Sequence, residues 1–126
     1  MSASRKCILV VDDERFILKS LQRILEDDYA VITVLGGQAA LDILAKQDGQ
    51  VDVILCDLSM PTVDGADLYH KIAEIYPGLE ERIIFMTGGA YTPGVKEFIA
   101  RVKNVCLKKP FDEGELELAL KRILSV

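Results

Sequence analysis

Short apolar runs alternate along the chain with longer segments in which apolar residues recur every three or four positions. A short run bounded by polar or turn residues is typical of a strand buried on both faces, and the longer spacing is typical of an amphipathic helix. The pattern predicts strands over residues 7–11, 29–34, 51–56, 82–86 and 105–107. It predicts helices over residues 15–27, 36–49 and 66–76, a fourth helix that begins at Pro93 with Thr92 as its cap, and a fifth after Asp112.

Strands that alternate with helices in this way predict a doubly wound α/β fold, in which helices cover both faces of a five-stranded parallel sheet. The runs centred on Ile8, Val53 and Ile84 are the most uniformly apolar, so we expect them to be the central strands. The helical spacing places Ile24 in the inward stripe of the first helix and Ile75 in that of the third.

Length and charge narrow the class of protein. A chain of 126 residues fits one domain with its own core, and a formal net charge of −5 argues against nucleic acid or an anionic membrane as the main partner. No apolar run approaches the length of a membrane span and the first residues lack the apolar core of a signal peptide, so we expect a cytoplasmic protein.

The cysteines, Cys7, Cys56 and Cys106, lie in apolar runs, and their spacing matches no metal-binding or redox motif. We expect them to be reduced thiols in the core.

Polar side chains stand at the ends of the first, third, fourth and fifth predicted strands: Asp12, Asp13, Asp57, Thr87 and Lys109. The carboxyl ends of parallel strands meet at one edge of a sheet, so we expect these side chains to lie close together. Converging carboxylates would repel one another without a cation among them. Oxygen ligands, with no His or Cys at these strand ends, favour Mg²⁺.

A carboxylate beside Mg²⁺ can also act as a nucleophile, which would make Asp57 a phosphoryl acceptor. Phosphoryl transfer needs the oxygens of the moving group to be neutralised by a metal, a cation and hydroxyl or amide donors. Lys109, Thr87 and the backbone amides after Asp57 would supply the groups other than the metal. Simple Mg²⁺ binding and phosphorylation of Asp57 both explain the acids, and Lys109 and Thr87 favour phosphorylation.

Motifs in register continue this pattern along the chain: Asp12-Asp13, Asp57 with Met60-Pro61 and Gly65 after it, Thr87-Gly88, and Lys109-Pro110-Phe111. Together they resemble the receiver domain of two-component response regulators, which implies a CheY-like, flavodoxin-like fold. On this resemblance we expect residues 1–126 to form a single receiver domain with no output domain. A natural single-domain regulator and a receiver excised from a hybrid histidine kinase both remain open.

The resemblance implies that Asp57 accepts a phosphoryl group from a histidine kinase or a histidine phosphotransfer protein in a Mg²⁺-dependent reaction. It implies that Asp13, Asp57 and the backbone carbonyl of Ser59 hold Mg²⁺, while Asp12 acts mainly through water. The phosphorylated protein would be a signalling switch rather than a metabolic enzyme, because it catalyses only its own phosphorylation and dephosphorylation.

The resemblance also assigns Thr87 and Lys109 to the phosphoryl oxygens and implies a cis bond between Lys109 and Pro110. Phosphorylation would change the surface of the fourth helix, fifth strand and fifth helix, where a downstream protein or a second receiver would bind. Phe16 and Leu118 fall outside the inward stripes of their helices, so we expect both to be exposed. We predict that Phe16 contacts the phosphodonor and that Leu118 contacts a partner or a second receiver.

Some positions depart from the family pattern or bear on rival functions. The family often has an aromatic residue three positions before the lysine, where this chain has Cys106, so the signal would travel through the backbone or other packing. Ser59 and Gly89 carry no side chain that would direct a hydrolytic water, which leaves the rate of autodephosphorylation open. A phosphatase of the haloacid dehalogenase type needs an acid at the position of Ser59, so the sequence argues against that enzyme class. A pseudo-receiver, which would bind partners without phosphorylation, is supported by Cys106 alone.

Overall fold

The structure is a computed structural model that describes residues 5–60, 64–88 and 92–124. The elements in chain order are β1 (Cys7–Asp12), α1 (Arg15–Leu25), β2 (Ala30–Leu35), α2 (Gly36–Lys46), β3 (Val53–Asp57), α3 (Gly65–Ile75), the 3₁₀ helix η1 (Leu79–Arg82), β4 (Ile83–Thr87), α4 (Pro93–Arg101), β5 (Cys106–Lys108) and α5 (Glu113–Leu124). The predicted strands and helices are all present, with ends shifted by up to three residues. The additional element, η1, was not predicted from the pattern.

The five strands form one parallel sheet in the order β2-β1-β3-β4-β5. This order confirms the doubly wound α/β fold and the central position of β1, β3 and β4. All side chains of β3 and β4 are buried, as expected for strands covered on both faces.

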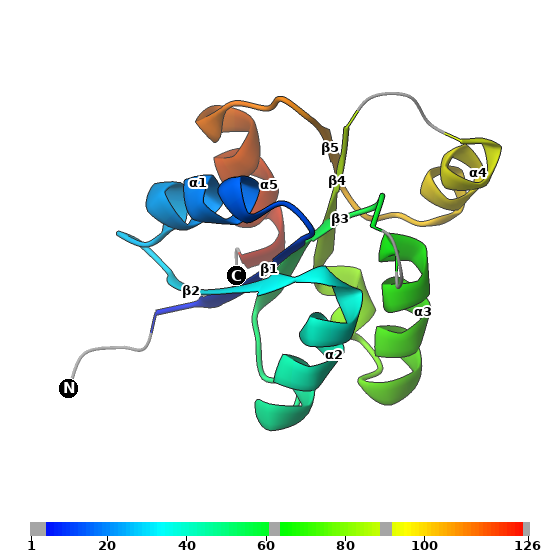
Figure 1. The fold of residues 1–126 in the computed structure, drawn as a ribbon, viewed down its shortest axis with the longest axis horizontal. Helices are drawn as coiled ribbons and strands as arrows, with labels where there is room; N and C mark the ends of the chain where they lie inside the picture. Colours follow the sequence, from blue (N-terminus) through cyan, green and yellow to red (C-terminus); the bar gives the residue numbers. More distant parts are fainter. Residues whose placement is uncertain (1–4, 61–63, 89–91, 125–126) are drawn as a thin grey trace.

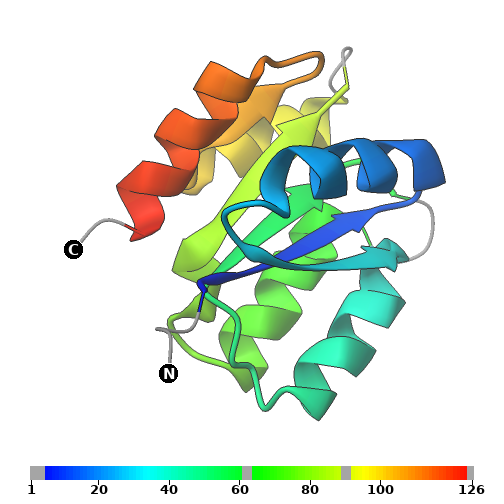
Figure 2. The same cartoon turned by 90° about the vertical axis from the view of Figure 1, so that its left-hand side faces the viewer.

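Two helical layers cover the sheet (Figures 1 and 2), and the alternation of side chains along each strand divides the core between them. On one face, α1 and α5 pack on a cluster that includes Ile8, Val10, Val53, Leu55, Ile84 and Met86. On the other face, α2, α3 and α4 pack on a cluster that includes Leu9, Val11, Ile54, Cys56, Ile83 and Phe85.

Helix ends follow local sequence signals. The Thr92 hydroxyl accepts a hydrogen bond from the Val95 amide at 3.2 Å, with Pro93 in the first turn of α4 as predicted. Asp112 accepts one from the Glu115 amide at 2.8 Å before α5. No helix in the described ranges is long and apolar enough to cross a membrane.

The predicted inward stripes were wrong at Ile24 and Ile75, which are 36% and 55% exposed. In α1 the buried stripe runs through Leu18, Leu21 and Leu25, which leaves Ile24 at its edge. Ile75 is the last residue of α3, so no further turn of that helix follows to enclose it. Phe16 and Leu118 are exposed as predicted, at 67% and 66%.

Candidate functional site

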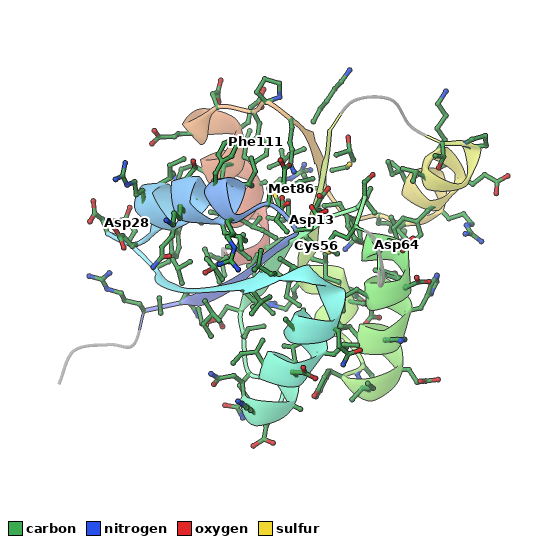
Figure 3. All side chains as sticks on the ribbon, viewed as in Figure 1. Asp13, Asp28, Cys56, Asp64, Met86 and Phe111 are labelled. Carbon is green, nitrogen blue, oxygen red and sulfur yellow. The ribbon has the colours of Figure 1, made fainter. Side chains whose placement is uncertain are left out.

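The carboxyl ends of β1 and β3 bring three carboxylates together. Asp12, Asp13 and Asp57 each offer an oxygen within 4.8 Å of the others. Figure 3 labels Asp13, which follows β1, and Cys56, which precedes Asp57 on β3. The register partner of Asp57 on β4 is Met86. Asp12 and Asp57 are buried, whereas Asp13 is exposed, so the cluster is open to solvent on the Asp13 side.

Lys109 brings a positive charge to these acids from the segment after β5. Its Nζ donates a hydrogen bond to Asp12 Oδ2 at 2.9 Å and lies 3.6 Å from Asp57 Oδ2. The neighbouring Lys108 is exposed, so the structure places the lysine that precedes Pro110 at the acids, as the sequence indicated. The peptide bond between Lys109 and Pro110 is cis.

Burial and like charges act on the protonation of Asp57. Burial is the main cause that raises its pKa, from an ordinary value of 3.8 to about 6, and the charge of Asp12 raises it further. Lys109 and the Ser59 amide act in the opposite direction without cancelling these effects. The metal-free site therefore opposes the ionisation of Asp57, which a bound cation would favour.

Burial alone would lower the pKa of the Lys109 ammonium, but its hydrogen bond to Asp12 and the charge of Asp57 outweigh that effect. The pKa of Lys109 is therefore raised above its ordinary value of 10.5, and the side chain stays positively charged at neutral pH. A permanent cation beside Asp57 suits the binding of an anionic group.

Backbone groups fix the orientation of Asp57. The Ser59 amide donates to Asp57 Oδ1 at 3.2 Å, and the Leu58 amide donates to the Met86 carbonyl at 2.9 Å. The first residue of α3, Gly65, passes close to this turn, because a Cβ atom there would lie 2.9 Å from the Asp57 carbonyl oxygen and from Leu58 Cα. Only glycine allows α3 to begin so near the end of β3 without a shift.

Thr87 ends β4 and is 2% exposed. Strand alternation places its side chain on the same face as Phe85, towards α3 and α4, whereas Asp12 and Asp57 alternate towards α1 and α5. The Thr87 carbonyl accepts a hydrogen bond from the Lys109 amide at 2.7 Å, which ties the two strand ends together.

These groups surround a cavity of about 450 Å³, lined by Asp13, Glu14, Asp57, Ser59, Thr87, Gly88, Val95 and Lys109. The structure thus brings all five strand-end side chains of the sequence analysis to one site, since Asp12 is hydrogen-bonded to Lys109 at its floor. Pro61 and Gly89, which also figured in the motifs, lie outside the described residues.

Sequence reasoning missed Glu14 and Val95 as lining residues. Glu14 is adjacent to the two acids and could have been included on that ground. Val95 belongs to the first turn of α4, and its place at the cavity depends on how that helix packs, for which the sequence carries no local signal.

The thiol next to Asp57 is a core group, as predicted. Cys56 is fully buried, its Sγ lies 3.4 Å from the Asp57 carbonyl oxygen, and burial raises its pKa above the ordinary value of 9.0. A thiol that stays protonated is a poor nucleophile and a poor metal ligand. Cys7 and Cys106 are half-buried and free.

A second hollow adjoins the acidic cavity. It measures about 460 Å³ and shares Gly88 and Lys109 with that cavity; its walls include Phe16, Ile17, Leu21, Ile24, Pro110 and Phe111. Its walls are mainly apolar. We call this hollow, between α1 and the segment that follows β5, the α1 groove.

The donor set fits a hard divalent cation. Asp12, Asp13 and Asp57 offer carboxylate oxygens, which Mg²⁺ prefers, and their combined charge exceeds the single positive charge of Lys109. Excess negative charge at a solvent-accessible cluster is relieved by a cation.

Comparison with known proteins gives a consistent result. The model of the response regulator receiver domain family matches residues 8–121. The transcriptional regulatory protein GlrR of Escherichia coli (strain K12) is 30% identical over 126 residues, and the match covers 99% of this chain and 28% of the relative. The sensor kinase CckA of Brucella abortus (strain 2308) is 27% identical over 125 residues, covering 99% of this chain and 13% of the relative. The chain thus spans less than a third of either protein.

Solved structures agree with the sequence comparisons. A response regulator receiver domain protein from Clostridium thermocellum has a TM-score of 0.84 and 28% identity, with 94% of each chain covered. The Vibrio cholerae chemotaxis protein CheY4 has a TM-score of 0.80 and 27% identity, with 96% of this chain and 100% of that chain covered. The chain belongs to the response regulator receiver domain family of two-component signal transduction.

Proposed function

We propose that Asp57 accepts a phosphoryl group from a histidine kinase or a histidine phosphotransfer protein in a Mg²⁺-dependent reaction. Receiver domains interact with such donors and with downstream effectors, and they bind Mg²⁺ at an acidic pocket. The observation that carries the proposal is the placement of Asp57 within 4.8 Å of two further carboxylates and 3.6 Å from a lysine ammonium, at an open cavity.

Asp12, Asp13, Asp57 and the carbonyl of Ser59 would hold Mg²⁺, with Asp12 acting mainly through water. When bound, Mg²⁺ would neutralise the carboxylates and the phosphoryl oxygens, so that two anions can approach each other. Asp13 is the exposed member of the acids and faces the side from which an ion would enter.

The residues of the chain would carry the transfer itself. An Asp57 carboxylate oxygen forms a bond to phosphorus while the bond from phosphorus to the donor nitrogen breaks, and the nitrogen keeps that electron pair. The Ser59 amide, 3.2 Å from Oδ1, holds the carboxylate in position. The Lys109 ammonium and the Thr87 hydroxyl would then bind the phosphoryl oxygens, which carry the negative charge.

The α1 groove is the surface we assign to the phosphodonor. It adjoins the acidic cavity through Gly88 and Lys109, so a donor that reaches Asp57 passes beside it. Helix α1 carries Arg15, Lys19 and Arg23 and no acid in a chain of net charge −5. Apolar side chains flanked by basic ones favour a donor surface with apolar and acidic residues.

Downstream partners would bind the surface of α4, β5 and α5. Leu118 is the large apolar side chain most exposed on α5, at 66%. Phosphorylation adds about two negative charges to the site. A partner that prefers the phosphorylated form of this surface would, by linkage, raise its population.

A small-molecule phosphodonor tests the chemistry without a protein partner. The purified chain is incubated with phosphoramidate or acetyl phosphate, with Mg²⁺ or with EDTA, and its intact mass is followed over time. We expect a gain of one phosphoryl group that needs Mg²⁺ and is absent in Asp57→Asn. No gain with either donor would overturn the proposal and favour a pseudo-receiver that binds partners constitutively.

A further inference from the structure

Helix α4 buries one side chain fully, while Val95 and Ile99 pack against the core only in part. Phe98, which is 3% exposed, is its single buried residue, whereas α1, α2, α3 and α5 each bury three. Figure 1 shows α4 at one end of the molecule, beside α3 and furthest from β2. The position of α4 therefore depends most on the packing of the Phe98 ring.

That ring lies in an aromatic cluster. Phe98 meets Phe85 of β4 edge to face at a centroid distance of 5.3 Å and Tyr69 of α3 at 5.4 Å. Tyr69 and Phe85 are 6.1 Å apart, and His70 lies 6.0 Å from Phe98 on the outer side. Edge-to-face pairs of this kind have a preferred geometry, so they fix the orientation of the helix as well as burying area.

The cluster is connected to the acidic cavity in two ways. Phe85 and Thr87 are two positions apart on β4, so their side chains project from the same face of the sheet. Val95 lies one helical turn before Phe98 and lines the cavity itself. A group bound at Asp57 is thus enclosed in part by the helix that Phe98 holds in place.

The partner strand offers no ring at this position. Cys106 is the register partner of Phe85 on β5, and it contributes a small, half-buried side chain to the same core face. The aromatic contacts of α4 therefore come from β4 and α3. A displacement of β4 would therefore reach α4 through the contact between Phe85 and Phe98.

We propose that Phe98 is a positioning residue that couples the occupancy of the Asp57 cavity to the order of α4. This inference rests on the proposed phosphorylation of Asp57. A phosphoryl group that draws Thr87 towards it shifts the end of β4, and Val95 repacks around the filled cavity. Because Phe98 joins both contacts to one rigid helix, α4 becomes more ordered and its outer surface changes.

The experiment uses beryllofluoride with Mg²⁺, a stable analogue of the phosphoryl group, so that no partner protein is needed. Two quantities are measured: the Kd of the analogue, and the hydrogen exchange of the α4 amides relative to those of α5. The variants are Phe98→Ala, the milder Phe98→Leu and, as a control, Leu44→Ala. Leu44 is fully buried in the same core cluster but lies on α2, with α3 between α2 and α4.

In the unmutated chain we expect the analogue to slow α4 exchange about tenfold, a factor within the usual range of couplings between sites. Phe98→Ala should remove this response and, by reciprocity, raise the Kd of the analogue about tenfold. Phe98→Leu should fall between the two. Leu44→Ala should lower the stability of the fold while keeping the α4 response and the Kd.

The outcomes separate the inference from the proposed function. A chain that binds no analogue would overturn both. A chain that binds the analogue without a change in α4 exchange would overturn the inference alone. The same holds if Phe98→Ala and Phe98→Leu keep the response, or if Leu44→Ala loses it to the same extent.

Discussion

The Asp57 carboxyl group is buried beside Asp12 and Asp13, and its pKa of about 6 lies above the ordinary value of 3.8. The folded protein therefore binds the Asp57 proton more tightly than the unfolded chain does. The contribution of Asp57 to the free energy of unfolding is fully present below about pH 4 and is lost as the pH rises through about 6. At neutral pH the ionised Asp57 is therefore destabilising, although the proposed transfer requires it in that form.

Asp57→Asn should accordingly stabilise the metal-free protein. The amide keeps the size of the side chain and removes its charge, so we expect a gain of about 1 kcal/mol in the free energy of unfolding at pH 7.5, after allowance for solvent screening. Urea denaturation in EDTA measures it. Asp27→Asn, an exposed acid on another part of the surface, is the control and should change little. Equal or lower stability of Asp57→Asn would refute the electrostatic description of the site.

The same pKa predicts how metal binding depends on pH. Mg²⁺ needs the ionised carboxylate, so protonation of Asp57 competes with the metal. With a pKa of about 6, the affinity for Mg²⁺ should fall about fourfold between pH 7.5 and pH 5.5. Isothermal titration calorimetry at the two pH values checks this. An affinity that does not change would mean that Asp57 is already ionised at pH 5.5 or does not hold the metal.

At the scale of elements, the end of β3 and the start of α3 must approach closely for the site to form. A methyl group at Gly65 would lie 2.9 Å from the Asp57 carbonyl oxygen, which is backbone and cannot rotate away. We expect Gly65→Ala to lower stability by about 1–3 kcal/mol and to weaken Mg²⁺ binding as the turn shifts.

Gly94→Ala is the matched control for Gly65→Ala. Gly94 lies in α4, and a Cβ there meets no atom within 4 Å, so alanine should be neutral or slightly stabilising in a helix. Thermal unfolding and Mg²⁺ titration of both variants provide the comparison. Equal behaviour of the two would show that the close approach at Gly65 does not matter.

The sequence predicted the elements and the five strand-end side chains because both follow from local rules. Strand alternation and the shared edge of a parallel sheet are enough to bring Asp12, Asp57 and Lys109 together. The exposure of Ile24 and Ile75 was not predicted. Helical spacing identifies the apolar side of a helix, but it does not show which residue of that side lies deepest or where the helix extends beyond the sheet. The place of Val95 at the cavity was missed for a similar reason, since it depends on how Phe98 of α4 packs against Phe85.

At the scale of the whole molecule, the proposed function assigns different partners to the acidic cavity, to the α1 groove and to the surface of α4, β5 and α5. The α1 groove adjoins the acidic cavity through Gly88 and Lys109, whereas α4 contributes Val95 to the wall of that cavity. On the proposed function, a phosphodonor would approach over α1, while α4, on the opposite face of the sheet, would respond to the transfer.

Phe16→Ala should slow phosphorylation by a histidine-phosphorylated donor protein and leave phosphorylation by acetyl phosphate unchanged. Phe16 is 67% exposed at the groove, and loss of a large apolar contact at an interface costs about 1–2 kcal/mol, or about five- to thirtyfold in transfer efficiency. Leu118→Ala, which removes an equally exposed side chain from α5, should leave transfer unchanged. A rate with the protein donor that is the same for Phe16→Ala and the unmutated chain would place the donor elsewhere.

The proposed function places the phosphoryl group on Asp57 rather than on Asp12 or Asp13. After incubation with acetyl phosphate and Mg²⁺, borohydride reduces an acyl phosphate to an alcohol and so converts the modified aspartate into homoserine. Peptide mass spectrometry then identifies the position. The proposed phosphorylation of Asp57 predicts homoserine at position 57, dependent on Mg²⁺ and absent without the phosphodonor. Homoserine at position 12 or 13, or at no position, would contradict it.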